Sequence, residues 1–285
     1  MATREDTDHP NVLIATGPDR PGLTAAITSA VAEAGGNIVE LGQQVDPYVG
    51  SYGCRVAIEG ELDRSVLDAR LGELSSQQEL RWVLHDVHVH PRIVICCSTA
   101  LHCVTDLTGR LLTGDLHGDL VGIVSDKEAA RSMTESLGVP YLHVPVGEER
   151  ADQEAAFGEA LGSLQPDLVI LARYMRILPS WLTERYAGRM INIHHSTLPA
   201  FPGANPRRRA HERGVKLIGA TAHYVTEELD EGPIIDQDVI RVGNHPVEEL
   251  VARGEDVERL VLARAVRLHL ERRVLIFGRR TCVFD

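Results

Sequence analysis

A run of buried strands alternating with helices, from Arg92 to His194, constrains the fold of this chain most strongly. The expected strands are R-I-V-I-C-C (92–97), L-V-G-I-V-S (120–125), Y-L-H-V (141–144), D-L-V-I-L-A (167–172) and M-I-N-I-H (190–194). Strands that are apolar on both faces are typical of parallel sheets covered by helices on both sides. We therefore predict a doubly wound, mainly parallel α/β domain, whose ligands gather beyond the carboxyl ends of its strands.

The first ninety residues follow a different order of elements. The pattern predicts strands at 11–16, 37–45, 52–58 and 80–89 and helices at 23–34 and 63–74. The order strand, helix, strand, strand, helix, strand is that of a ferredoxin-like βαββαβ sandwich. We expect two domains, at 10–90 and 91–285.

Composition excludes several classes of protein. The net charge is −12, which argues against a nucleic-acid partner, because clustered basic residues hold a phosphate backbone. Apolar runs are short and the first ten residues are polar, so we expect no membrane span, no signal peptide and a cytoplasmic protein. The five cysteines form no C-x-x-C pair, which favours reduced thiols over a disulfide or zinc framework.

The loop after the strand at 92–97 lacks a phosphate-binding motif. It reads S-T-A-L-H-C-V-T-D-L (98–107), without the glycines that let backbone N–H groups reach a phosphate. The sequence thus argues against NAD, FAD or ATP, and we expect no permanently bound cofactor.

Polar chemistry concentrates between Met190 and Asp238. Asn192 and His194 are two residues apart on a strand, so both side chains leave the same face, and His195 is expected to point away. Downstream, Asp230 precedes the Gly232-Pro233 turn. An Asn to polarise a carbonyl, a His to move protons and an Asp to orient the imidazole or a water together suit acyl chemistry.

Several long motifs resemble those of folate-dependent formyltransferases. They are A-R-Y-M-R-I-L (172–178), N-I-H-H-S-T-L-P-A-F-P-G-A (192–204), G-V-K-L-I-G-A-T-A-H-Y-V (214–225) and L-D-E-G-P-I-I-D-Q-D (229–238). The earlier D-R-P-G and G-G-N-I-V segments resemble the ACT domain, so the whole chain resembles the formyltetrahydrofolate deformylase family. The resemblance implies hydrolysis of 10-formyltetrahydrofolate to formate and tetrahydrofolate, which balances the one-carbon folate pool and supplies formate for purine synthesis.

The resemblance also implies roles for individual residues. Asn192, His194 and Asp230 would be the catalytic trio, and Thr221 and His223 would support it. The residues that would bind the folate are Met175, Arg176, Ile177, Leu178, Val225 and Leu229, with His102 near the ligand-binding edge. In the ACT domain, Asp19, Gly22 and Asn37 would border an amino-acid effector site, and the ACT sheet would favour a homodimer or homotetramer.

Three alternatives accompany this interpretation. Arg207, Arg208 and Arg209 form a basic cluster that could attract the folate glutamate tail or the phosphate of another acceptor, which would favour an amine formyltransferase. A noncatalytic folate or amino-acid sensor is the second alternative. A zinc site at His194, His195 and His223 is the third, and we expect no metal because no cysteine or further spaced histidine completes a known pattern.

Overall fold

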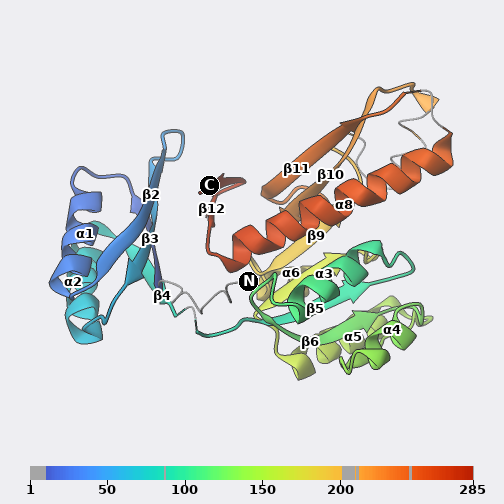
Figure 1. Cartoon of the computed structure of the whole chain (residues 1–285), viewed down its shortest axis with the longest axis horizontal. Helices are drawn as coiled ribbons and strands as arrows, with labels where there is room; N and C mark the ends of the chain where they lie inside the picture. Colours follow the sequence, from blue (N-terminus) through green and yellow to red (C-terminus); the bar gives the residue numbers. More distant parts are fainter. Residues whose placement is uncertain (1–10, 87, 201–208, 210–211, 244–245, 285) are drawn as a thin grey trace, which may run out of the picture. The chain divides into compact units, whose positions relative to one another are not determined.

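The computed structural model describes residues 11–86, 88–200, 209, 212–243 and 246–284. The chain groups into two compact units (Figure 1). The first runs through His90 and also includes Arg272–Phe277 and the residues from Cys282, whereas the second comprises Pro91–Glu271 and Gly278–Thr281. Among the described helices, none combines the length and apolar character needed to cross a bilayer.

The first unit is built around a four-stranded antiparallel sheet. Its elements are β1 (Asn11–Pro18), α1 (Leu23–Glu33), β2 (Asn37–Asp46), β3 (Ser51–Glu59), α2 (Arg64–Gln78) and β4 (Arg81–His85), and the strand order is β2-β3-β1-β4. This confirms the predicted ferredoxin-like arrangement. Strand β4 ends earlier than the predicted Val89, because Val12 at the start of β1 already lies opposite His85.

The two faces of this sheet are covered by different parts of the chain. Apolar side chains of α1 and α2, including Ile27 and Leu67, pack with Leu13 in one core. The run V-L-I-F-G-R-R-T-C-V-F (274–284) predicts a closing strand pair, and the structure confirms it as the hairpin of β12 (Val274–Phe277) and β13 (Arg280–Val283). Residues of this hairpin cluster with Ile14. A Cβ atom on Gly53 would lie 2.6 Å from Leu275, so a glycine allows this close approach.

A charged cluster adds to the attachment of the C-terminal segment. Arg273 donates two hydrogen bonds, of 2.8 and 3.0 Å, to the carboxylate of Glu40 on β2. Arg55, whose side chain is buried, lies 3.0 Å from the same carboxylate. Hydrogen bonding from Arg273 lowers the pKa of Glu40, and nearby Arg55 acts in the same direction.

The second unit contains a seven-stranded sheet. Its elements are β5 (Arg92–Cys97), α3 (His102–Leu112), β6 (Asp119–Ser125), α4 (Arg131–Ser136), β7 (Tyr141–His143), α5 (Arg150–Leu164), β8 (Leu168–Ala172), α6 (Ser180–Arg185), β9 (Met190–His194), β10 (Leu217–Tyr224), β11 (Ile234–Arg241) and α8 (Val247–Leu270). The strand order is β11-β10-β9-β8-β5-β6-β7. Strands β5 to β9 pair in parallel, and β10 and β11 add an antiparallel edge. The predicted doubly wound, mainly parallel domain is confirmed.

Two elements of this unit differ from the sequence expectation. Strand β11 was not predicted, because it follows the Asp-Glu-Gly-Pro turn directly and the polar residues in its middle leave it without a continuous apolar run. The sequence pattern predicts a helix over 127–137, whereas α4 covers only Arg131–Ser136. The N–H of Lys127 bonds to the hydroxyl of Ser125 and its carbonyl accepts from Tyr141, so this residue is held outside the helix.

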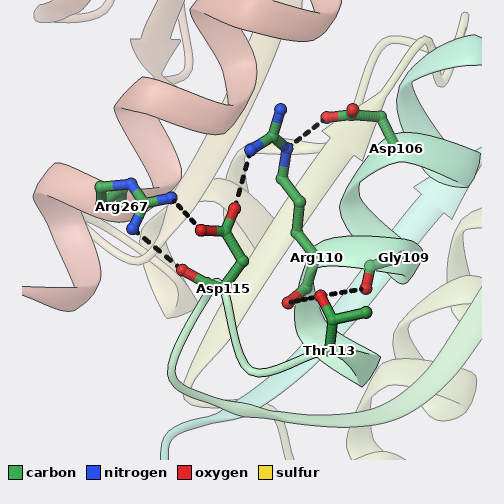
Figure 2. Close-up of polar contacts among 6 residues, drawn as sticks. All are labelled: Asp106, Gly109, Arg110, Thr113, Asp115 and Arg267. Carbon is green, nitrogen blue, oxygen red and sulfur yellow. Dashed lines mark hydrogen bonds and ion pairs between the residues drawn. The ribbon is translucent and has the colours of Figure 1, made fainter. Parts of the chain in front are cut away.

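Ion pairs join α3 to α8 (Figure 2). Asp115, just after α3, accepts hydrogen bonds from Arg110 at 2.7 Å and from Arg267 on α8 at 2.9 Å. Asp106 accepts a further hydrogen bond from Arg110. Arg267 and Arg110 lower the pKa of Asp115, so this carboxylate stays charged near neutral pH. The contact fixes α8 against α3, the helix that follows β5.

Candidate active site

Two neighbouring strands carry the predicted catalytic side chains. In the register of β9 with β10, Thr221 lies opposite His194 and His223 lies opposite Asn192. Side chains two apart on a strand leave the same face, so both pairs are presented together at this part of the sheet.

Asp230 completes the group from the loop between β10 and β11. Its carboxylate lies 3.3 Å from Nδ1 of His194 and 3.8 Å from Nε2 of His223, and its side chain is buried. Asp230 has a φ of 58°, a left-handed conformation that Asp tolerates better than most residues. A Cβ atom on Gly232 would lie 1.7 Å from the carbonyl oxygen of Tyr224, so only glycine fits the turn that places Asp230.

The hydrogen bonds of His223 define its tautomer. Nδ1 lies 2.9 Å from the carbonyl oxygen of Tyr224, which only accepts, so Nδ1 carries the proton. Burial lowers the pKa of His223, and its ring is neutral near pH 7. Nε2 is therefore an acceptor and receives the hydrogen bond from Nδ2 of Asn192 at 3.1 Å. This contact orients the Asn192 amide and leaves its second N–H available for a ligand.

His194 is buried, and its Nε2 has no hydrogen-bond partner within the described part of the chain. A buried imidazole nitrogen without a partner is costly unless a ligand or water meets it. His195 lines the same cavity, contrary to the expectation that it points away. The reason is that β9 ends at His194, so strand alternation does not extend to the next residue.

A cavity of about 190 Å³ opens beside these side chains. The predicted folate-binding residues that lie on its wall are Met175, Arg176, Ile177, Leu178, His223, Val225 and Leu229. Met175, Ile177 and Leu229 each remain 57% exposed, which gives the mouth of the cavity an apolar surface suited to a flat ring. Asn192, His194 and Asp230 also line the cavity, so the structure brings the predicted trio and the predicted pocket together.

The 174–178 loop is held by a buried polar pair. Ser98 donates to Asp126 at 2.6 Å, and Nε of Arg176 donates to the other carboxylate oxygen at 3.2 Å. The N–H of Met175 lies 3.4 Å from the Ser98 hydroxyl. These contacts anchor the loop at the carboxyl ends of β5 and β6.

Thr221 is fully buried and supports the site without lining the cavity. Its hydroxyl donates to the carbonyl of Ser196 at 2.8 Å and accepts from the N–H of Leu198 at 3.0 Å and from Gln237 at 2.8 Å. One hydroxyl thus fixes the turn that follows β9.

His102 lies away from the wall of this cavity. Its Nε2 bonds at 2.7 Å to Glu258, a fully buried carboxylate on α8. Arg173, which follows β8 and does line the cavity, lies 3.6 Å from the same carboxylate. The sequence pattern did not predict that Arg173 and Glu258 lie beside the site. Helix α8 carries a stripe of buried apolar residues that includes Val257 and Val261. The charged Glu258 lies next to this stripe, and that was the sequence signal that could have marked it as a buried polar residue.

The three residues proposed to border an effector site do not come together within the first unit. Pro18, just before Asp19, lies opposite Ser51 at one end of β3, whereas Asn37 lies opposite Glu59 at the other end. Eight residues of strand separate these positions by roughly 27 Å, since α1 carries the chain from one end of the sheet to the other. Gly22 has a φ of 90° at the start of α1, which accounts for a glycine there.

Of the predicted basic cluster, Arg207 and Arg208 lie outside the described residues. Arg209 is described and exposed.

The fold and the Asn-His-Asp site define the class of protein. Residues 91–266 match the model of the formyl transferase family and residues 9–83 match that of the ACT domain. A deformylase structure from Pseudomonas syringae superposes with a TM-score of 0.95 at 40% identity, covering 98% of this chain and 96% of that chain. A glycinamide ribonucleotide transformylase 1 from Symbiobacterium toebii superposes with a TM-score of 0.66 at 34% identity, covering 69% of this chain and 95% of that chain.

A full-length relative narrows the class further. The formyltetrahydrofolate deformylase of Synechocystis is 42% identical over 279 residues, which cover 95% of this chain and 97% of the relative. The chain belongs to the formyltetrahydrofolate deformylase family.

Proposed function

We propose that this protein hydrolyses 10-formyltetrahydrofolate to formate and tetrahydrofolate. The observation that carries the proposal is the convergence of Asn192, His194 and Asp230 on one cavity, with Asp230 3.3 Å from the imidazole of His194. The names of the full-length relatives support the same substrate.

The formyl group on N10 is a formamide, so its hydrolysis forms a carbon–oxygen bond to water and breaks the carbon–N10 bond. Asp230 holds the attacking water and removes its proton. The second N–H of Asn192 and a protonated His194 donate to the oxygen that becomes negative as water adds. His194 then returns a proton to N10, and formate and tetrahydrofolate leave.

His223 acts in this scheme as a neutral support. Its Nε2 accepts from Asn192, so it cannot compete for Asp230 as a donor. In the proposed reaction the carboxylate of Asp230 contacts His194 and holds the water. The 3.8 Å separation of Nε2 from Asp230 agrees with two acceptors that do not bond to each other.

The pterin ring binds between the 174–178 loop and the 225–229 loop, whose side chains line the cavity. Anchoring of Arg176 by Asp126 fixes one wall before substrate arrives. The site needs no permanent cofactor, since every step uses groups of the protein and water.

Two competing functions predict different reactions. An amine formyltransferase would release the formyl group only to an amine, and a noncatalytic sensor would bind the folate without releasing formate. Purified protein should be mixed with 10-formyltetrahydrofolate in amine-free buffer, and formate and tetrahydrofolate should both be measured. Hydrolysis predicts equal amounts of the two products, whereas release that requires an added amine, or tight binding without release, contradicts the proposal.

The cysteines indicate the redox compartment in which the protein works. Five unpaired cysteines, four of them buried, suit a reducing cytoplasm.

Strand β2 lies at one edge of the first sheet and exposes Val39 and Leu41, which suits pairing with a second copy in a homodimer or homotetramer. An amino-acid effector of the ACT domain would then bind where residues of two copies meet, because Asp19 and Asn37 lie far apart in one copy.

A further inference from the structure

Three charged or polar side chains meet beside the carboxyl ends of β5 and β8. Strand β5 is the first strand of its domain and lies between β8 and β6, so the strand order reverses here. Doubly wound sheets usually bind a ligand in the crevice at such a switch point. In this protein, His102 begins the helix after β5, Arg173 follows β8, and Glu258 reaches the same place from α8.

The contacts among these residues are close. Glu258 has no exposed side-chain surface, and its Oε2 lies 2.7 Å from Nε2 of His102 and 3.6 Å from Nε of Arg173. The Arg173 side chain is 17% exposed and lines the candidate active-site cavity. Within the described residues, its Nε and Nη1 atoms are buried without a hydrogen-bond partner. Arg173 therefore lies against the negative charge of Glu258 and also lines the cavity that holds the proposed catalytic residues.

The backbone of Arg173 supports a specific role for this side chain. Its φ is 63°, a conformation that an arginine adopts only at a cost in free energy and that glycine adopts readily. A site that needed only the turn would be better served by glycine. The presence of a long cationic side chain at this position indicates that the side chain itself is used.

A metal ion offers another interpretation of the cluster. His102, Cys103 and Glu258 have ligand atoms within 4.8 Å of one another. Arg173 already supplies positive charge next to Glu258, and a cation there would be repelled by the guanidinium. Burial also raises the pKa of the Cys103 thiol, which disfavours the thiolate that a metal would need.

We propose that Arg173, held by Glu258, which also bonds to His102, makes water the acceptor by filling the crevice through which an amine would approach the formyl carbon. This inference rests on the proposed hydrolytic function. In the normal reaction, water adds its oxygen to the formyl carbon, the carbon–N10 bond breaks, N10 gains one proton, the second proton of the water passes to solvent, and formate leaves. An admitted amine would instead form a carbon–nitrogen bond, lose one proton, and leave as a formamide while N10 gains its proton.

The test measures how the formyl group divides between water and an amine. Wild type, Arg173→Gly and Arg272→Gly receive 10-formyltetrahydrofolate with and without glycinamide, and formate and N-formylglycinamide are quantified after subtraction of the enzyme-free reaction. Arg272 is the matched control, because it is also an arginine with positive φ, at 57°, and it belongs to the first unit. The ratio of the two products does not depend on the fraction of active enzyme, so a purely structural effect leaves it unchanged.

Wild type and Arg272→Gly should yield formate alone. Arg173→Gly should keep hydrolysing and should raise the ratio of formylated amine to formate by about tenfold or more, the scale on which pocket shape discriminates between substrates. Arg173→Lys should restore formate as the main product. If circular dichroism shows that Arg173→Gly is unfolded, the double variant Arg173→Gly with Glu258→Gln, which also removes the buried negative charge beside position 173, serves in its place.

Three results would overturn the inference. They are formylation of glycinamide by wild type, an unchanged ratio in a folded Arg173 variant, and loss of both reactions in a folded variant, which would place Arg173 in the water reaction itself. Failure of the underlying function is distinguishable, because wild type would then release no formate in the absence of amine.

Discussion

Asn192 donates a hydrogen bond from Nδ2 to Nε2 of His223 over 3.1 Å, and this contact links the two central strands of the site. His223 accepts it because its other nitrogen is committed to the carbonyl of Tyr224. The neutral histidine therefore sets the direction of the amide that faces the substrate. An oxyanion donor oriented before substrate binds needs no rearrangement during the reaction.

Replacing Asn192 with alanine should lower kcat by about 10²–10³, the usual effect of removing one oxyanion donor. KM should change little, because the donor acts mainly on the transition state. Steady-state kinetics of Asn192→Ala, with Ile191→Val on the same strand as a control, separates the two constants. A rise in KM with an unchanged kcat would assign Asn192 to ground-state binding instead.

Replacing Thr221 with valine should destabilise the second unit and reduce activity together. Valine has a similar shape but removes the hydroxyl that bonds to the Ser196 carbonyl and the Leu198 N–H, at a cost of about 2–4 kcal/mol in the free energy of unfolding. Urea denaturation and kcat should both be measured for Thr221→Val. The hydroxyl-retaining Thr221→Ser should recover most of the loss, and equal behaviour of the two variants would refute this role for the hydroxyl.

Stability of the first unit should fall as the pH is lowered from 7.5 to 6. Burial, with a smaller contribution from Arg272, lowers the pKa of His85 from 6.5 to about 4. The unfolded chain therefore binds a proton below pH 6.5 that the folded chain does not, so the contribution of His85 is complete above pH 6.5 and is lost toward pH 4. Because His85 is only partly buried, solvent screening keeps the expected loss at pH 6 below about 0.8 kcal/mol.

Urea denaturation of wild type and His85→Gln at pH 7.5 and 6 measures this loss. The variant should show a smaller decrease than wild type, whereas His88→Gln, which alters an exposed histidine nearby, should match wild type. Equal pH dependence in wild type and His85→Gln would show that other groups control the effect.

The sequence pattern was sufficient for the parts of the fold that follow from periodicity. Apolar strands separated by helices predicted the parallel sheet, and alternation along 190–194 placed Asn192 and His194 on one face. Motif resemblance linked Asp230 to them across the intervening chain. These features depend on local patterns that a single sequence displays.

Features that depend on distant packing were not predictable in the same way. The contact of Glu258 with His102 joins residues 156 positions apart, and no local pattern specifies it. The positive φ of Arg173 arises from the path of the loop after β8. Attachment of Phe284 beside Gly42 on β2 likewise depends on tertiary contacts that helix and strand periodicity do not encode.

The turnover of Asp230→Asn tests the central claim most directly. The amide keeps the size of the side chain but cannot accept a proton from water, and it also removes the charge 3.3 Å from His194. We predict that kcat for release of formate from 10-formyltetrahydrofolate falls by about 10³ or more, while the dissociation constant for the folate stays close to that of wild type. A near-normal kcat in a folded Asp230→Asn protein would contradict the proposed mechanism.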